Sequence, residues 1–142
     1  MHIVALMFIA LVVLQSLLGG AVFTAIVGWT PQAIGDYYAA KTFHGLLETL
    51  LPHTLFISIA LMGSLHFLGF IATISEQQKE RWIHLLFGLF ILDQSAPIFI
   101  NLGFDFFAYV KLGAFFGFEA ALASVSYLLF RHSLHQSSTV SQ

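Results

Sequence analysis

The chain has 142 residues, of which 58% are hydrophobic and only 8% are charged. Soluble domains carry about 25% charged residues, and a soluble fold of this length could not bury so much apolar surface, so lipid must be the main solvent. The formal net charge of −2, without a basic cluster, excludes a nucleic-acid partner. The absence of cysteine excludes disulfides, thiolate metal sites and a cysteine nucleophile.

The first apolar run, residues 3–28, contains no charged side chain. At about 1.5 Å of rise per residue it is long enough to cross a hydrocarbon core of about 30 Å. Residues 28–41 follow as a predicted loop, punctuated by Pro31 and Gly35. Aromatic rings with polar groups favour the headgroup level, so this loop is expected to cap one end of the bundle at the membrane interface.

Three further helices are predicted at residues 43–74, 82–103 and 106–130, followed by a polar tail at 131–142. The second contains Pro52, which can kink it, and the third contains Pro97 near its middle. The charged residues 75–81 form the expected aqueous turn between them. The sequence therefore predicts an all-α polytopic membrane protein, in which four transmembrane helices form an antiparallel up-down bundle as one domain, residues 1–142.

An even number of spans places both ends of the chain on the side of the charged turn. That side carries Lys79, Arg81 and Arg131, whereas the other carries Lys41 and Lys111, which is expected to snorkel to the interface. The positive-inside rule then favours cytoplasmic termini, in a membrane of the bacterial inner-membrane type.

Two carboxylates mark the predicted functional centre. Counting rise from the expected helix ends places Asp93 and Glu119 near the bilayer midplane, at the depth of Gln15. A carboxylate at this depth costs about 3 kcal/mol on insertion scales, so each needs a partner, a proton or water. If the two approach each other, the pKa of one should rise strongly. Pro97 also frees the backbone carbonyl of Asp93, which then needs a donor.

These carboxylates, with Gln15, Gln94 and Asn101 as substrate-binding groups, predict the floor of an intramembrane pocket. The second helix supplies the rest of the predicted catalytic set, because His44, Glu48 and His53 would line the route to the first loop.

The same three side chains are candidate ligands for iron, copper or zinc. A bis-histidine haem is disfavoured, because the only cross-helix pair, His66 and His84, differs in depth by about 9 Å. No cofactor is identified by the sequence.

Four functions fit this pattern. The leading one is acid/base chemistry on a small lipophilic substrate in the carboxylate and histidine pocket. The second is proton-coupled transport of a small molecule by a homodimer, which requires a carboxylate reachable from both sides. The third is a redox protein with a metal or haem b. The fourth is a non-catalytic accessory subunit of a larger membrane complex, in which the polar groups satisfy one another or a partner.

Overall fold

The computed structural model describes residues 2–139. Its elements are α1 (His2–Val22), which continues into a short π-helical segment η1 (Phe23–Val27), then α2 (Pro31–Ala39), α3 (Phe43–Gly69), α4 (Glu76–Asn101) and α5 (Phe107–Thr139). Four of these segments are long and apolar enough to cross a membrane. The described residues contain no strand, so the predicted all-α bundle with four transmembrane helices is confirmed.

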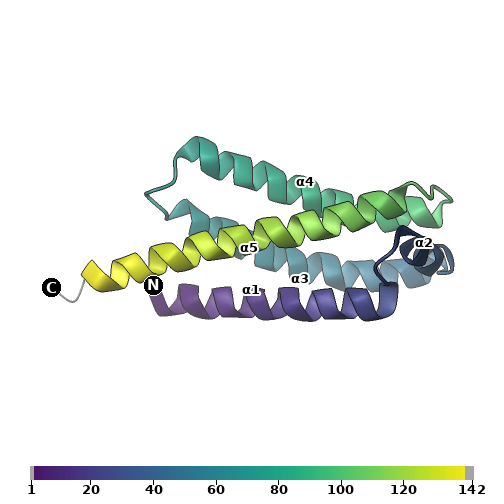
Figure 1. The fold of residues 1–142 in the computed structure, drawn as a ribbon, viewed down its shortest axis with the longest axis horizontal. Coiled ribbons are helices and arrows are strands. Elements are labelled where there is room, and N and C mark those ends of the chain that lie inside the picture. The colour runs from purple at the N-terminus through teal and green to yellow at the C-terminus, as the bar shows by residue number, and fades with distance from the viewer. Residues whose placement is uncertain (1, 140–142) are drawn as a thin grey trace.

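The four long helices run along one axis, and α2 lies at one end (Figure 1). Successive long helices alternate in direction, so the start of α1, the α3–α4 connection and the end of α5 share the opposite end. Helix α5 packs against every other helix and most extensively against α4, whereas α1 packs mainly against α5. Helix α5 is therefore the central element of the bundle.

The segment predicted as an interfacial loop contains the nine-residue helix α2. Thr30 caps it by accepting a hydrogen bond from the amide of Ala33, and Pro31 occupies the first helical position, where its missing N–H costs nothing. Ile34 and Tyr38, one turn apart, are buried against the bundle. The segment is thus a short amphipathic helix that covers the end of the bundle.

Helix α4 begins at Glu76, six residues earlier than expected, because Ser75 and Gln78 form a reciprocal capping box. The charged residues after it are therefore helical. Lys79 is buried and donates to the carbonyl of Gly69 at 3.0 Å, which satisfies a free group at the end of α3. Helix α3 ends there, five residues before the predicted boundary, and α5 continues to Thr139, into the predicted polar tail.

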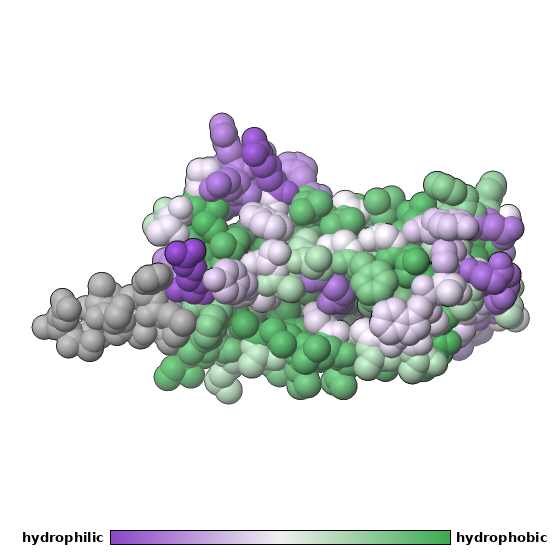
Figure 2. Space-filling model, viewed as in Figure 1, coloured by the Kyte–Doolittle hydropathy of each residue, from purple (hydrophilic) through white to green (hydrophobic). Residues whose placement is uncertain are grey.

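The buried apolar side chains form two clusters. One cluster lies toward the α3–α4 connection and extends along α4 as far as Phe90. The other lies beneath α2 and includes apolar residues of α4 from Ile98 onward. The exterior is also largely apolar along the middle and hydrophilic at its two ends (Figure 2). Only 11% of the first span is buried inside the bundle, as expected where lipid covers the remaining surface.

Candidate functional site

A buried ion pair joins α4 and α5 beside the apolar cluster that lies beneath α2. The ammonium of Lys111 on α5 is 2.6 Å from Oδ1 of Asp93 on α4, and the two side chains are only 6% and 9% exposed. Lys111 also donates to the backbone carbonyl of Asp93 at 3.1 Å. Pro97 leaves this carbonyl without its helical donor, so one ammonium satisfies both the carboxylate and the open backbone group.

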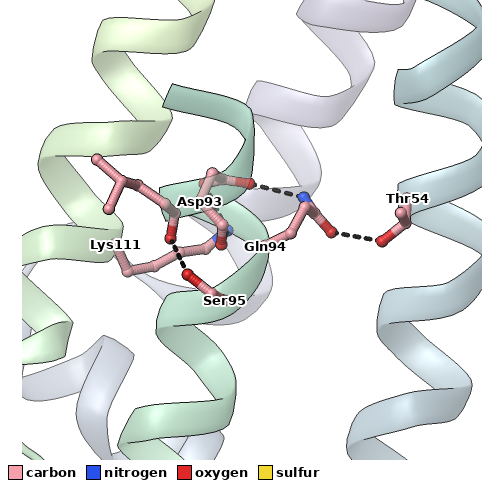
Figure 3. Close-up of polar contacts among 6 residues, drawn as sticks. Thr54, Asp93, Gln94, Ser95 and Lys111 are labelled. Carbon is pink, nitrogen blue, oxygen red and sulfur yellow. Dashed lines mark hydrogen bonds and ion pairs between the residues drawn. The ribbon is translucent and has the colours of Figure 1, made fainter. Parts of the chain in front are cut away.

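Two further side chains extend the pair to α3. Gln94 donates from Nε2 to the second carboxylate oxygen of Asp93 at 2.8 Å, and Thr54 donates to Oε1 of Gln94 at 2.9 Å (Figure 3). Helices α3, α4 and α5 are thereby joined at one level. We call Thr54, Asp93, Gln94 and Lys111 the polar layer.

Helix α2 lies over this layer. Burial, followed by the negative charge of Asp93 and the neighbouring Tyr37, raises the pKa of the Tyr38 hydroxyl well above its usual range. The side-chain amide of Asn101 donates to the backbone carbonyls of Tyr38 at 3.0 Å and Lys41 at 2.7 Å. Asn101 was predicted to bind substrate; in the structure, the Nδ2 group of its amide holds the end of α2 against α4.

The polar layer is nearer to α2 than the sequence predicted. The predicted helix ended at residue 103, ten residues beyond Asp93, whereas α4 ends at Asn101, so Asp93 lies eight residues, or about 12 Å, from that end of the 26-residue helix. Lys111 is four residues from the start of α5 at Phe107, and its long side chain reaches inward to the carboxylate. The expectation that Lys111 snorkels to the interface was therefore wrong.

Glu119 is separate from this layer. It lies half-buried on α5, where its carboxyl contacts the hydroxyl of Ser16 on α1. No described hydrogen bond joins the carboxyl groups of Glu119 and Asp93. Gln15, the neighbour of Ser16, is exposed. Gln15 and Glu119 each lie twelve residues from the α2 end of their spans, at Val27 and Phe107, which places both about 18 Å deep.

The candidates on α3 do not converge on either carboxylate. His44 and Glu48 pair with each other at 3.2 Å, with side chains 85% and 68% exposed. His53 is exposed, and its Nδ1 lies 3.0 Å from the backbone carbonyl of Thr49. Among the residues searched, no group of three or more histidine, aspartate or glutamate side chains is arranged to hold a metal ion. The predicted three-ligand set is thus not assembled within the described part of the chain.

The remaining intramembrane histidines are also on the outside. His66 packs edge-on against Phe67 and Phe70, and Nδ1 of His84 lies 2.8 Å from the carbonyl of Glu80. Both side chains are exposed.

Sequence reasoning missed Lys111 as the partner of Asp93. The signal was present, because the carbonyl freed by Pro97 required a donor and Lys111 was the only cation placed within the fourth predicted helix. Two ion-pair partners eighteen residues apart, on helices joined by a short turn, are within reach of each other. A lysine side chain that points inward rather than outward was not recognisable from position alone.

Comparison with known proteins supports the membrane assignment. A family model described as a transmembrane helical domain matches residues 28–139. The match covers α2 to α5, so it contains the whole polar layer and Glu119, whereas Gln15 and Ser16 lie before it. No curated protein and no solved structure showed significant similarity.

Proposed function

Because the chain belongs to this family of transmembrane helical domains, we propose that it is an integral membrane protein that forms a subunit of a larger assembly. Its α1–α5 face, which we define by Gln15, Ser16, Gly19 and Glu119, associates laterally with another membrane-embedded chain. The observation that carries this proposal is the contrast between two sets of polar groups. The polar layer is satisfied internally, whereas Gln15 is exposed without a described hydrogen bond and Glu119 is half-buried with Ser16 as its described partner, both about 18 Å from the α2 end of their spans.

The polar layer offers little to a substrate. Both carboxylate oxygens of Asp93 already accept hydrogen bonds, one from Lys111 and one from Gln94. A general acid or base must reach the proton that it transfers, and this carboxylate is nine-tenths buried with its acceptors in use. The layer is better suited to fixing the packing of α3, α4 and α5.

The α1–α5 face has the opposite character. A half-exposed carboxyl in hydrocarbon is costly, and its only described side-chain partner is the hydroxyl of Ser16. Gly19, one turn after Ser16 on α1, has open space where a side chain would be, so another helix could approach closely. An amide or hydroxyl from that helix would satisfy Glu119 and Gln15 together.

The test is the size of the complex extracted from native membranes in a mild detergent. We expect the wild-type chain to run as part of a larger assembly, and Gln15→Leu combined with Glu119→Leu to release it as a monomer. Glu48→Gln is the matched control, because this exposed carboxylate lies on α3 and should leave the assembly intact. A monomeric wild-type chain in native membranes would refute the proposal.

A second candidate function rests on the same carboxyl. Glu119 is half-buried beside the hydroxyl of Ser16, so its partly exposed carboxyl could exchange a proton with a small lipophilic substrate that arrives laterally. A lipophilic carbodiimide distinguishes the two functions, since it reacts with accessible protonated carboxyls. In the assembly, Glu119 is covered and is labelled only after dissociation; in the acid/base protein, it is labelled in the native membrane. Glu119→Gln identifies the labelled site.

The revised charge distribution supports a proposal for the side of the membrane that each end of the bundle faces. Lys111 is buried in the polar layer, so it no longer counts among the cations flanking the spans. The end with the α3–α4 connection has Lys79, Arg81 and Arg131, and the other end retains Lys41. We propose that the former end faces the cytoplasm of a bacterial-type inner membrane, because cations within short loops favour that side.

A further inference from the structure

A shallow groove lies on α4 near the α3–α4 connection, far from the polar layer. It is lined by Gln78, Arg81, Trp82 and Leu85. Their spacing of three, four and seven residues places them on one face of the helix. This is the end where hydrophilic residues border the apolar exterior, so the groove lies where headgroups meet acyl chains (Figures 1 and 2).

The groove has hydrogen-bond donors without described acceptors. Arg81 is exposed and takes part in no ion pair or hydrogen bond in the described part of the chain, and the same is true of the indole N–H of Trp82. Gln78 uses Oε1 to accept from the amide of Ser75 at 3.2 Å, which leaves its Nε2 as a donor. One cation and two neutral donors thus surround the same concave surface.

Among the described residues of this face, Arg81 is the cation without an ion-pair partner. Lys79 is engaged by Glu76 at 2.9 Å and by the carbonyl of Gly69. Glu80 precedes Arg81 directly, and adjacent residues on a helix do not face each other. The groove therefore complements a single negative charge with several acceptor oxygens.

We propose that this groove binds the phosphate of an anionic phospholipid. The guanidinium of Arg81 would pair with the phosphodiester, with Gln78 Nε2 and the indole N–H as further donors, and Leu85 would lie along the upper part of an acyl chain. Tryptophan at this depth is suited to such a role because its ring is apolar and its N–H remains at the polar level. The glycerol headgroup of phosphatidylglycerol is uncharged, so this lipid carries one negative charge, which the positive charge of Arg81 neutralises.

Fluorescence can test this binding directly, because the chain has two tryptophans and Trp29 lies at the other end of the bundle. The full chain carrying Trp29→Phe, reconstituted in nanodiscs, reports on Trp82 alone. Quenching by phosphatidylglycerol with brominated acyl chains is compared with quenching by brominated phosphatidylcholine at equal mole fraction. Arg81→Gln removes the proposed ligand, and Arg131→Gln removes a cation at the same end that does not line the groove.

We expect phosphatidylglycerol to associate with the groove about fivefold more strongly than phosphatidylcholine, the contribution of one basic residue near a membrane surface. Arg81→Gln should abolish this preference, and Arg131→Gln should retain it, with circular dichroism confirming that both variants are folded. Equal quenching by the two lipids, or equal losses in the two variants, would overturn the proposal. Inorganic phosphate should leave Trp82 fluorescence unchanged in zwitterionic nanodiscs, and a saturable response would assign the groove to a soluble anion instead.

Discussion

Replacing Lys111 with methionine should destabilise the bundle strongly, because it breaks the buried ion pair with Asp93. The substitution preserves most of the apolar stem but leaves the Asp93 carboxylate with Gln94 as its only described donor, and leaves the Asp93 carbonyl with none. Removing one partner of a buried ion pair costs about 3–5 kcal/mol, since a charge then remains buried without compensation. Both side chains are more than nine-tenths buried, so solvent screening does not reduce this figure appreciably.

The assay is reversible unfolding in mixed micelles, with sodium dodecyl sulfate as the denaturant and tryptophan fluorescence as the signal. Lys111→Met should lower the free energy of unfolding by about 3–5 kcal/mol, and adding Asp93→Asn should restore about half of the loss, because the uncompensated charge is removed. Lys41→Met is the control, since this lysine lies over the ring of Tyr37 and should cost no more than about 1 kcal/mol. If Lys111→Met unfolds with wild-type stability, or if the double variant is no more stable than the single, the ion pair does not stabilise the bundle as argued.

Three further predictions concern α2 and helix packing. Asn101→Ala should increase amide hydrogen exchange in α2 but not in α3, because two hydrogen bonds worth about 0.5–1.5 kcal/mol each are lost. Mass spectrometry measures this exchange, with α3 as the internal reference. Unchanged exchange in α2 would contradict the anchoring role of Asn101. Gly113→Ala meets no atom within 4 Å and should be neutral or stabilising in the same unfolding assay, whereas Gly117→Ala should be less favourable, since its new Cβ would lie 3.1 Å from a methyl of Leu89, which must shift; a Gly117→Ala variant more stable than Gly113→Ala would contradict this packing. Up to about pH 11, Tyr38→Phe should show the same absorbance at 295 nm as the wild type, because the raised pKa keeps the Tyr38 hydroxyl protonated in the folded state. An unfolded tyrosine ionises near pH 10, so the folding stability of the wild type should fall as the pH rises above 10. A lower absorbance in the variant than in the wild type would show that Tyr38 ionises normally.

Composition and hydropathy were sufficient for the fold class, because four long apolar segments in lipid have few alternatives to a helical bundle. Helix ends were less predictable. Ser75 and Gln78 look like part of a polar turn until they are recognised as a capping box, and Thr30 followed by Pro31 is a helix start that a loop-like composition concealed. At both helix starts, the signal consisted of residues within one helical turn of each other, so it could have been recognised from the sequence.

The candidate site was harder, because it depends on which way side chains point. Rise along a helix gives depth only when both helix ends are known, and because α4 begins six residues earlier than expected, Asp93 lies toward the α2 end of the helix rather than at its middle. Helical periodicity did place His44 and Glu48 together, yet it could not say that their shared face is turned outward. The pairing of Asp93 with Lys111 required knowing that α5 is the central helix, and that is a property of the assembled bundle.

The polar layer also bears on how the chain enters the membrane. Asp93 alone in α4, or Lys111 alone in α5, would each oppose insertion, by at most the roughly 2.5–3.5 kcal/mol that a charge costs at a helix centre. The two residues are only eighteen positions apart on either side of the tight turn between α4 and α5, so they can neutralise each other within a single helical hairpin. Helices α4 and α5 are therefore expected to leave the translocon as one unit, with their ion pair formed before α1 and α3 pack around them.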